Sequence, residues 1–184
     1  MTESLPIAVI VYTGHAASDP VVAEFARRLQ QRGLKVRGLR QEDGPAAPGR
    51  APATTLIDLA NGERHRISLD LGPGATSCKV DTSAVAAVSR VLREALHDDP
   101  DLVIVSRFGT LEAEGRGFSA EMLALMEAGV PLLTVTAQKH LEAWRRFTGG
   151  AAAELPVELG AIESWFACLP PRTRAGGPRH EAVS

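Results

Sequence analysis

The sequence predicts a three-layer α/β protein, in which a mostly parallel sheet has helices on both faces and carries an inserted β-hairpin. Three apolar runs are too short for helices and are typical of strands buried on both faces: Ile7–Tyr12, Leu102–Val105 and Val130–Val135. Stretches with helical spacing of apolar residues lie between them. The Asn61-Gly62 pair, between two strand-like segments, predicts the hairpin.

The composition is that of one globular domain. Of the 184 residues, 45% are hydrophobic but only 4% are aromatic, so we expect an aliphatic core. A single domain is predicted over residues 1–169 and a disordered tail over residues 170–184, which are polar and rich in proline and glycine. The net charge of −2 argues against general binding to nucleic acid or to a membrane surface.

The amino terminus has no basic stretch before its first apolar run, so we expect a cytoplasmic protein without a signal peptide. No apolar run approaches the roughly 18 residues of a membrane span. The two cysteines, Cys78 and Cys168, form no CxxC pair and are expected to be reduced thiols. The five histidines show no metal-ligand spacing, so no metal site is predicted.

Periodicity and turn residues place the elements of the first half of the chain. Pro20 suits the first turn of a helix that Ser18 or Asp19 can cap, and Gly33 stops that helix. The segment from Asp43 to Ala53, rich in Gly, Pro and Ala, predicts a surface loop. The predicted elements are a strand at 7–12, a helix from Pro20 to Gly33, a strand at 34–39, and hairpin strands at 54–59 and 64–69.

The second half alternates helices with buried strands. Asp81 or Thr82 can cap a helix whose apolar residues form one stripe. Gly129 and the Gly149-Gly150 pair are expected to stop two later helices. The predicted elements are that capped helix, the buried strand that starts at Leu102, a helix at 118–128, a strand at 130–135, and helices at 138–147 and 159–168.

The loop after Leu102–Val105 is the main candidate for a binding site. In open α/β sheets, ligands bind at the carboxyl ends of the strands, and this loop begins there with Ser106 and Arg107. Arg107 and Arg116 can each pair with two oxygens of a phosphate-like anion. The alternative is that both arginines pair internally with nearby glutamates, Glu112 and Glu114.

The first strand-to-helix loop occupies the place of a P-loop but lacks its chemistry. Counted from Gly14, the motif requires Gly, Lys and Ser or Thr where this chain has Asp19, Pro20 and Val21. Gly14, His15 and Ser18 remain candidates for contacts to a ligand in this loop. The alternative is an ordinary turn between a strand and a helix.

A second small-residue segment, LGPGATS, precedes three further candidates. Ser77, Cys78 and Lys79 can line the same crevice, and a thiol beside a lysine can be reactive. The alternative is that Cys78 is simply a small buried residue. The sequence has no GxSxG motif, so Glu112 is the sole candidate catalytic residue, as a general base acting on water.

Several segments together resemble a known family. The segments CKVD, SRFGTLEAEGRG and LEAWRRFTG resemble the GCRLD, NKFGKxEAEGRG and LEAWxxFxG segments of an uncharacterised bacterial family whose genes often lie beside molybdate-transport genes. More distantly, the chain is similar to thermophile-type P-loop nucleoside triphosphatases. These have a DLxTGE hairpin and an acidic DEIGxxE segment, of which only Glu112 is retained here. Ser106-Arg107 replaces the Asp-Glu pair that those enzymes associate with magnesium.

The resemblance implies a degenerate P-loop NTPase-like fold that binds without hydrolysis. The expected ligand is a small oxyanion or a nucleotide, in molybdenum uptake or cofactor metabolism, and the sequence names no cofactor. One alternative is a divergent nucleoside triphosphatase that uses Glu112. Another is a protein-interaction module whose surface is the helix of Trp144, and self-association into a homo-oligomer is left open.

Overall fold

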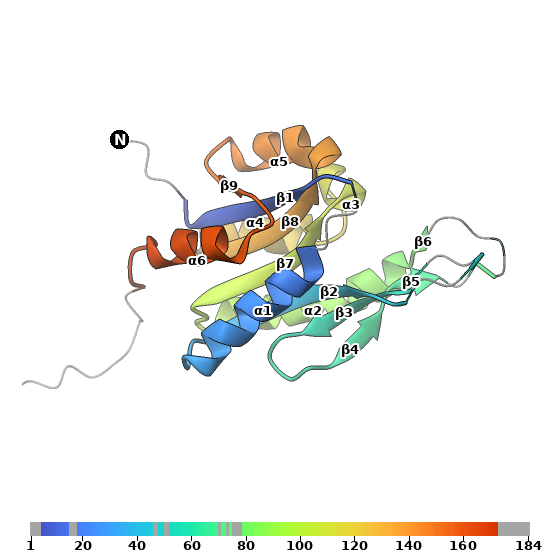
Figure 1. Ribbon diagram of the computed structural model, residues 1–184, viewed down its shortest axis with the longest axis horizontal. Coiled ribbons are helices and arrows are strands. Elements are labelled where there is room, and N and C mark those ends of the chain that lie inside the picture. The colour runs from blue at the N-terminus through green and yellow to red at the C-terminus, as the bar shows by residue number, and fades with distance from the viewer. Residues whose placement is uncertain are drawn as a thin grey trace, which may run out of the picture.

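The computed structural model shows a central sheet between two layers of helices (Figure 1). The structure describes residues 5–14, 18–45, 48–49, 52–69, 71–72, 74 and 79–172. The strands of the central sheet are β1 (Ile7–Tyr12), β2 (Val36–Asp43), β3 (Thr54–Asp58), β4 (Arg64–Arg66), β7 (Leu102–Phe108), β8 (Leu132–Ala137) and β9 (Ala153–Leu155). Their order across the sheet is β4-β3-β2-β7-β8-β1-β9.

The sheet is mostly parallel, as the sequence predicts. Strands β2, β7, β8, β1 and β9 pair in parallel, whereas β3 and β4 form the antiparallel inserted hairpin next to β2. Carboxyl ends of parallel strands meet at one edge of a sheet, so the ends of β1, β2 and β7 lie at the same edge. The fold therefore brings together the loops that the sequence marks as candidate sites.

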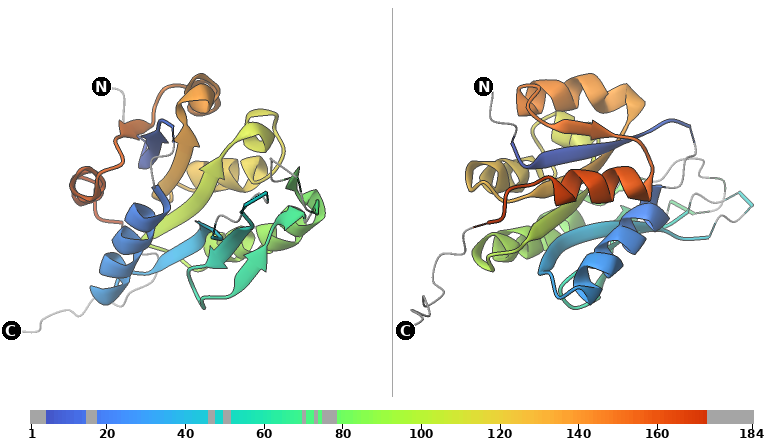
Figure 2. Two further views of the ribbon diagram at one scale, coloured as in Figure 1. Left: turned by 45° about the vertical axis from the view of Figure 1, so that its right-hand side comes forward. Right: turned by 60° about the vertical axis from the view of Figure 1, so that its left-hand side comes forward.

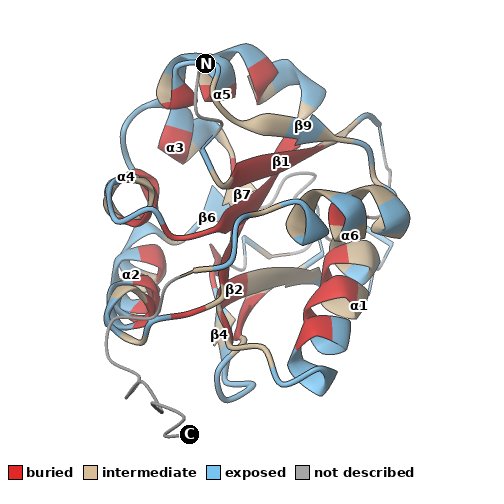
Figure 3. Ribbon diagram, turned by 90° about the vertical axis from the view of Figure 1, so that its left-hand side faces the viewer, coloured by how far each residue is buried: buried red, intermediate tan, exposed pale blue. Residues whose placement is uncertain are grey.

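Helices cover both faces of this sheet, and Figure 3 shows that their buried residues face inward. The helices are α1 (Ser18–Gln31), α2 (Thr82–His97), α3 (Thr110–Ala113), α4 (Ser119–Glu127), α5 (Leu141–Thr148) and α6 (Leu159–Ala167), with a 3₁₀ turn η1 (Gln138–His140) before α5. Residues of α1 and α6 form one hydrophobic cluster with the sheet, and residues of α2, α4 and α5 form the other. Asp81 caps α2 by accepting hydrogen bonds from the backbone N–H of Ser83 and Ala84, as predicted.

The second strand of the hairpin is shorter than the sequence predicts. Ile67 is buried and divides the segment in two, because the chain changes its pairing partner there. Before it, β4 pairs with β3; after it, β5 (Ser68–Leu69) pairs with β6 (Lys79–Val80) in a separate small sheet. This small sheet projects from the body of the molecule at the start of α2 in Figure 1, and the left-hand view of Figure 2 shows that end turned toward the viewer.

Three further elements differ from the sequence prediction because they are too short for a periodic pattern. β9 has three residues and is identified by its pairing with β1, and α3 is a single turn. The helix expected at 138–147 begins with the turn η1 and becomes α-helical only at Leu141. None of the helices in the described ranges is long and apolar enough to cross a bilayer.

Gly38 allows β2 and β7 to pair closely, and this generates a test of the fold. It has a φ of 100°, and a Cβ there would lie 2.1 Å from the carbonyl oxygen of Ile104. We expect Gly38→Ala to lower the free energy of unfolding by at least about 3 kcal/mol. Gly33→Ala is the control, because Gly33 also has a positive φ but a Cβ there meets no atom within 4 Å. That change should lower it by about 1 kcal/mol, and equal losses in chemical denaturation would contradict the steric argument.

Candidate functional site

A pocket of about 630 Å³ opens where β1, β2 and β7 end beside the first turn of α1. It lies at the carboxyl edge of the sheet, where ligands bind in this class of fold. Tyr12 and Gly14 come from the end of β1, and Ser18 and Asp19 come from the start of α1. Arg107 reaches the pocket from β7.

Arg107 projects into the pocket because the ladder between β7 and β8 is irregular at this residue. Ser106 pairs with Val135 and Phe108 pairs with Thr136, so Arg107 has no partner in the register. Phe108 meanwhile packs edge to face with Trp144, with ring centroids 5.1 Å apart. The buried Phe108 therefore anchors the end of the strand, while Arg107 is left to make polar contacts.

The guanidinium of Arg107 is held by groups from three elements. Its Nη2 donates to both carboxylate oxygens of Asp19 at 3.2 Å and lies 3.7 Å from a carboxylate oxygen of Asp43. Its Nη1 donates to the hydroxyl of Tyr12 at 3.3 Å, and its central carbon lies 5.2 Å from the centroid of that ring. Its buried Nε has no hydrogen-bond partner among the described residues, so the guanidinium keeps a donor unused.

Asp19, in the first turn of α1, is a partly buried carboxylate with a raised pKa. Its side chain is 17% exposed, and burial raises its pKa above the ordinary value. The guanidinium of Arg107 opposes this rise in pKa, and the nearby charge of Asp43 adds to it. Asp19 is therefore more easily protonated than an exposed aspartate.

Ser18 places a hydroxyl in the wall of the same pocket. The residue is only 1% exposed, and its Oγ has no hydrogen bond of good geometry within the described part of the chain. It lies close enough to Asp19 to lower the pKa of that carboxyl slightly. The hydroxyl thus places a group that can donate or accept a hydrogen bond beside Asp19 in this wall of the pocket.

The opposite wall carries a second group of charges at the end of β2. Arg40 donates to Glu42 at 3.3 Å, and Arg64 of β4 donates to the same carboxylate at 2.6 Å. The hydrogen bond from Arg64 is the main reason why the pKa of Glu42 is lowered. With Asp19 and Asp43, the described lining has three carboxylates and two arginines, and Arg64 adds a third guanidinium beside Glu42. The charges of these described side chains therefore balance, and each arginine already has a carboxylate partner.

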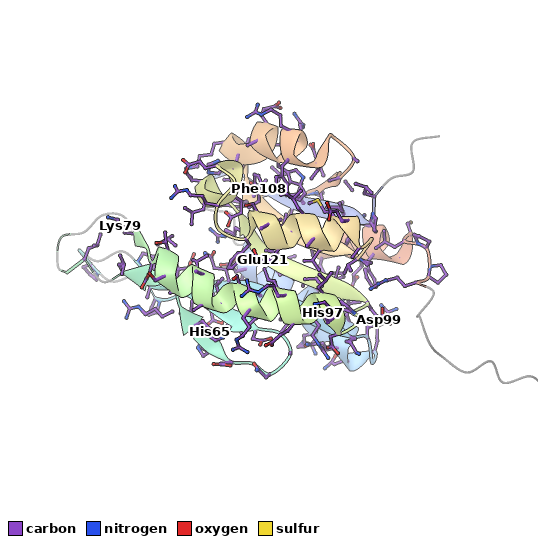
Figure 4. The ribbon with its side chains drawn as sticks, turned by 180° about the vertical axis from the view of Figure 1, so that it is seen from behind. His65, Lys79, His97, Asp99, Phe108 and Glu121 are labelled. Atoms are coloured by element: carbon purple, nitrogen blue, oxygen red, sulfur yellow. The ribbon has the colours of Figure 1, made fainter. Side chains whose placement is uncertain are left out.

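The structure brings together three of the residues that the sequence marks as ligand-binding: Gly14, Ser18 and Arg107. Ser106 is buried within β7 and does not line this pocket. Lys79 lies on the projecting small sheet, far from Phe108 in Figure 4. His15, Ser77 and Cys78 fall outside the described residues, and their ligand contacts stay predictions.

Arg116 lies apart from Arg107 on the surface. Its side chain is 60% exposed and pairs with Glu114, as the alternative interpretation of this loop expects. Arg107 also pairs internally, but its partner is Asp19, which lies 88 residues earlier in the chain, and not Glu112 or Glu114. The two arginines therefore do not form one anion site.

Glu112 is occupied by the backbone of its own loop. It is 6% exposed, and its two carboxylate oxygens accept hydrogen bonds from the N–H groups of Gly109 and Phe118, each at 3.0 Å. Gly117 must be glycine here, since a Cβ would lie 2.1 Å from one of those oxygens. The geometry explains Glu112 and the neighbouring glycine as parts of a turn, whereas a general base needs a free oxygen facing substrate.

Sequence reasoning missed five polar residues of the pocket, namely Tyr12, Asp19, Arg40, Glu42 and Asp43. Asp19 was considered only as a helix cap and as a departure from the P-loop motif. Tyr12 was assigned to a strand only, and the predicted strand at 34–39 ended before the other three. In the structure β2 continues to Asp43 and pairs with β3 along its whole second half. The segment RQED is an unbroken polar run without the alternation typical of a half-buried strand, so no local signal marks this extension.

The order of the strands and the helices on both faces match a P-loop NTPase-like α/β fold. The structure resembles the solution structure of a human cancer-related nucleoside triphosphatase, with a TM-score of 0.61 and 17% identity. The likeness covers 88% of this chain and 93% of that one. A likeness of this extent shows a shared fold.

The chain belongs to the family described as "Protein of unknown function (DUF2478)", which matches residues 7–165. It is also 33% identical, over 177 residues, to the molybdenum import ATP-binding protein ModC 2 of Bradyrhizobium diazoefficiens. That match covers 96% of this chain but only 20% of the relative. The chain thus spans about a fifth of the length of the relative.

The contacts of Glu112 generate a test of its role. We expect Glu112→Gln to lower the free energy of unfolding by about 1 to 3 kcal/mol, because an amide places an N–H group against a buried backbone N–H. Glu114→Gln is the matched control; Glu114 is exposed and pairs only with Arg116 within the described region. It should change stability by less than about 0.5 kcal/mol. Chemical denaturation of both variants measures the difference, and equal stabilities would contradict the structural role.

Proposed function

We propose that this protein binds a small phosphate-bearing anion, foremost a nucleotide, in the pocket of Arg107, and that it does not hydrolyse it. The observation that carries the proposal is the guanidinium of Arg107 inside a cavity at the carboxyl edge of the sheet, beside the start of α1. An arginine and a helix amino terminus both favour phosphate. The buried hydroxyl of Ser18 adds a polar group to the same wall.

The size and walls of the pocket suit such a ligand. Its volume of about 630 Å³ lies within the usual range for small-molecule sites. The ring of Tyr12 forms part of the lining, where a flat group of a ligand can stack. The similarity to a relative named an ATP-binding protein supports a nucleotide over a bare oxyanion.

Absence of hydrolysis is proposed from the residues that replace catalytic groups. Pro20 and Val21 stand at the positions of the P-loop lysine and hydroxyl, so the terminal phosphates lack those two contacts. Arg107 stands where the related hydrolases carry an acidic residue. Both oxygens of Glu112 are held by backbone N–H groups, which disfavours the alternative of a divergent triphosphatase.

A role in molybdenum uptake is proposed from the same relative. That protein is named for molybdenum import and contains a region similar to almost the whole of this chain. A domain found joined to another in one protein often acts with it when separate. We propose that nucleotide binding here serves molybdenum import or cofactor metabolism in a bacterial cell.

The third candidate function, an interaction module built on the helix of Trp144, has less support. Trp144 is 1% exposed and packs between Phe108 and Phe147, so its ring belongs to the core. It cannot serve as a surface anchor without disturbing α5. The pocket of Arg107 therefore remains the better founded site.

Calorimetry with the purified protein tests the proposal. We expect binding of ATP, ADP, GTP or GDP, or of inorganic phosphate, and we expect Arg107→Ala to weaken it at least about tenfold because a charge-assisted hydrogen bond to the ligand is lost. Arg116→Ala is the matched control, since it removes the same charge from an exposed position outside the pocket. It should leave the affinity unchanged.

A phosphate-release assay with the same nucleotides and magnesium completes the test. We expect no turnover above background. Turnover that Glu112→Gln abolishes without loss of folding would instead establish the triphosphatase. No binding of any of these ligands, or equal losses in the two arginine variants, would remove the proposal.

A further inference from the structure

Arg107 is already neutralised by the protein, and this limits which anions can bind beside it. Its Nη2 faces both oxygens of Asp19, and the described lining of the pocket holds three carboxylates and two arginines. An anion that approaches Arg107 must therefore come close to the carboxylate of Asp19. Two like charges in contact cost several kcal/mol unless a hydrogen lies between them.

We infer that Asp19 determines specificity: the pocket takes an oxyanion that carries or readily takes up a proton, as phosphate and phosphate monoesters do, and rejects fully ionised oxyanions such as sulfate and molybdate. The inference rests on the proposed function and names the ligand class of that same site. A hydroxyl of the ligand donates to Asp19, while Arg107 donates to an ionised oxygen of the ligand. The hydrogen-bonding groups of the ligand and the site are thereby complementary, since the ligand hydroxyl matches the acceptor Asp19 and the ionised oxygen matches the donor Arg107.

The geometry supplies both halves of this recognition. Asp19 and Arg107 are partly exposed to the pocket, at 17% and 27% of their side chains. The guanidinium of Arg107 contacts Asp19 through Nη2 and Tyr12 through Nη1 at 3.2 to 3.3 Å, and both nitrogens carry two hydrogens that can be shared with a ligand oxygen. Ser18 offers a hydroxyl next to Asp19 in the same wall, which can either donate or accept.

The charged and polar groups that the described elements place around Asp19 are consistent with a carboxylate that accepts a hydrogen bond from a ligand hydroxyl. Arg107 from β7 faces it directly, and Tyr12 from β1 holds the other side of the guanidinium. From β2, Asp43 adds a negative charge, whereas Arg40 and Glu42 are paired with one another. Burial raises the pKa of Asp19, so the cost of placing a hydrogen on or near it is lowered.

The consequence for molybdenum is specific. Molybdate is fully ionised near neutral pH and brings no hydrogen to Asp19, so it should not be the ligand of this pocket. Any role of this protein in molybdenum uptake would then depend on a phosphate-bearing ligand. The inference therefore distinguishes phosphate from molybdate, although the two anions have the same shape.

Calorimetric titration with inorganic phosphate and sulfate is the test, because the two anions have the same shape but differ in the proton. We expect the unmodified protein at about pH 7.5 to bind phosphate at least roughly tenfold more tightly than sulfate or molybdate. Asp19→Asn removes the charge while keeping the size of the side chain. It should improve sulfate affinity at least roughly tenfold and bring the two affinities close together.

Asp43→Asn is the matched control, since it removes an equal charge that lies 3.7 Å from Arg107 and is 40% exposed. It should improve sulfate affinity by a smaller factor, because a more exposed charge is better screened. Circular dichroism and thermal unfolding establish that each variant is folded.

The pH dependence of sulfate binding gives a second measurement that needs no folded Asp19 variant. Sulfate stays fully ionised across the range, so any proton must reach Asp19 from solvent. Because burial raises the pKa of Asp19, its charge is lost at a higher pH than that of an exposed aspartate, and sulfate affinity should rise as the pH is lowered through the titration of that carboxyl. The same titration with Arg107→Ala measures how much sulfate affinity changes with pH because the net charge of the whole protein changes.

The outcomes distinguish this inference from the proposed function. If the unmodified protein binds sulfate or molybdate as tightly as phosphate, the inference is wrong and the anion site stands. The inference is also wrong if Asp19→Asn and acid pH both leave sulfate binding unchanged. If neither phosphate nor any nucleotide binds to the unmodified protein or to Asp19→Asn, the proposed function itself is wrong.

Discussion

The burial of the central strands on both faces is the constraint on which the rest of this structure depends. Residues of β1, β7 and β8 contribute to hydrophobic clusters on each side of the sheet and are fully buried there. A charged group within these strands would lose its hydration without a partner. Polar chemistry is therefore confined to the strand ends, and the parallel arrangement gathers those ends at one edge. Arg107 can project into a pocket because it is the second-last residue of its strand.

The charges of the pocket are balanced within the protein. The guanidinium of Arg107 comes from β7 and the carboxylate of Asp19 comes from the first turn of α1, and the two side chains pair at 3.2 Å. Either charge alone would be partly buried without its partner. The two positions therefore have to be considered together.

The sequence predicts the strands of the central sheet well because two-sided burial leaves a clear apolar run. It predicts Arg107 as a site residue because a charge directly after such a run must lie at the edge. The sequence does not predict the partner of Arg107. Glu112 and Glu114 are the nearest acidic residues in sequence, but the carboxylate of Glu112 accepts hydrogen bonds from the backbone of its own turn. Asp19 is 88 residues away and becomes a neighbour only through the strand order. No local sequence pattern shows that a residue at the start of α1 will lie beside a residue at the end of β7. Short elements such as β9 are missed for another reason, because three residues are too few to show a periodic pattern.

Glu112 and Asp19 differ in how readily they can exchange hydrogen-bond partners. Glu112 is buried and accepts two backbone hydrogen bonds that have no substitute if they break, so its contacts contribute to folding. The pair of Asp19 and Arg107 is open to solvent at 17% and 27% of its side chains, and partly exposed pairs contribute little net stability. A ligand can therefore replace part of this pair at small cost to the fold. The Asp19–Arg107 pair can therefore change partners without disturbing the hydrogen bonds that hold the turn of Glu112.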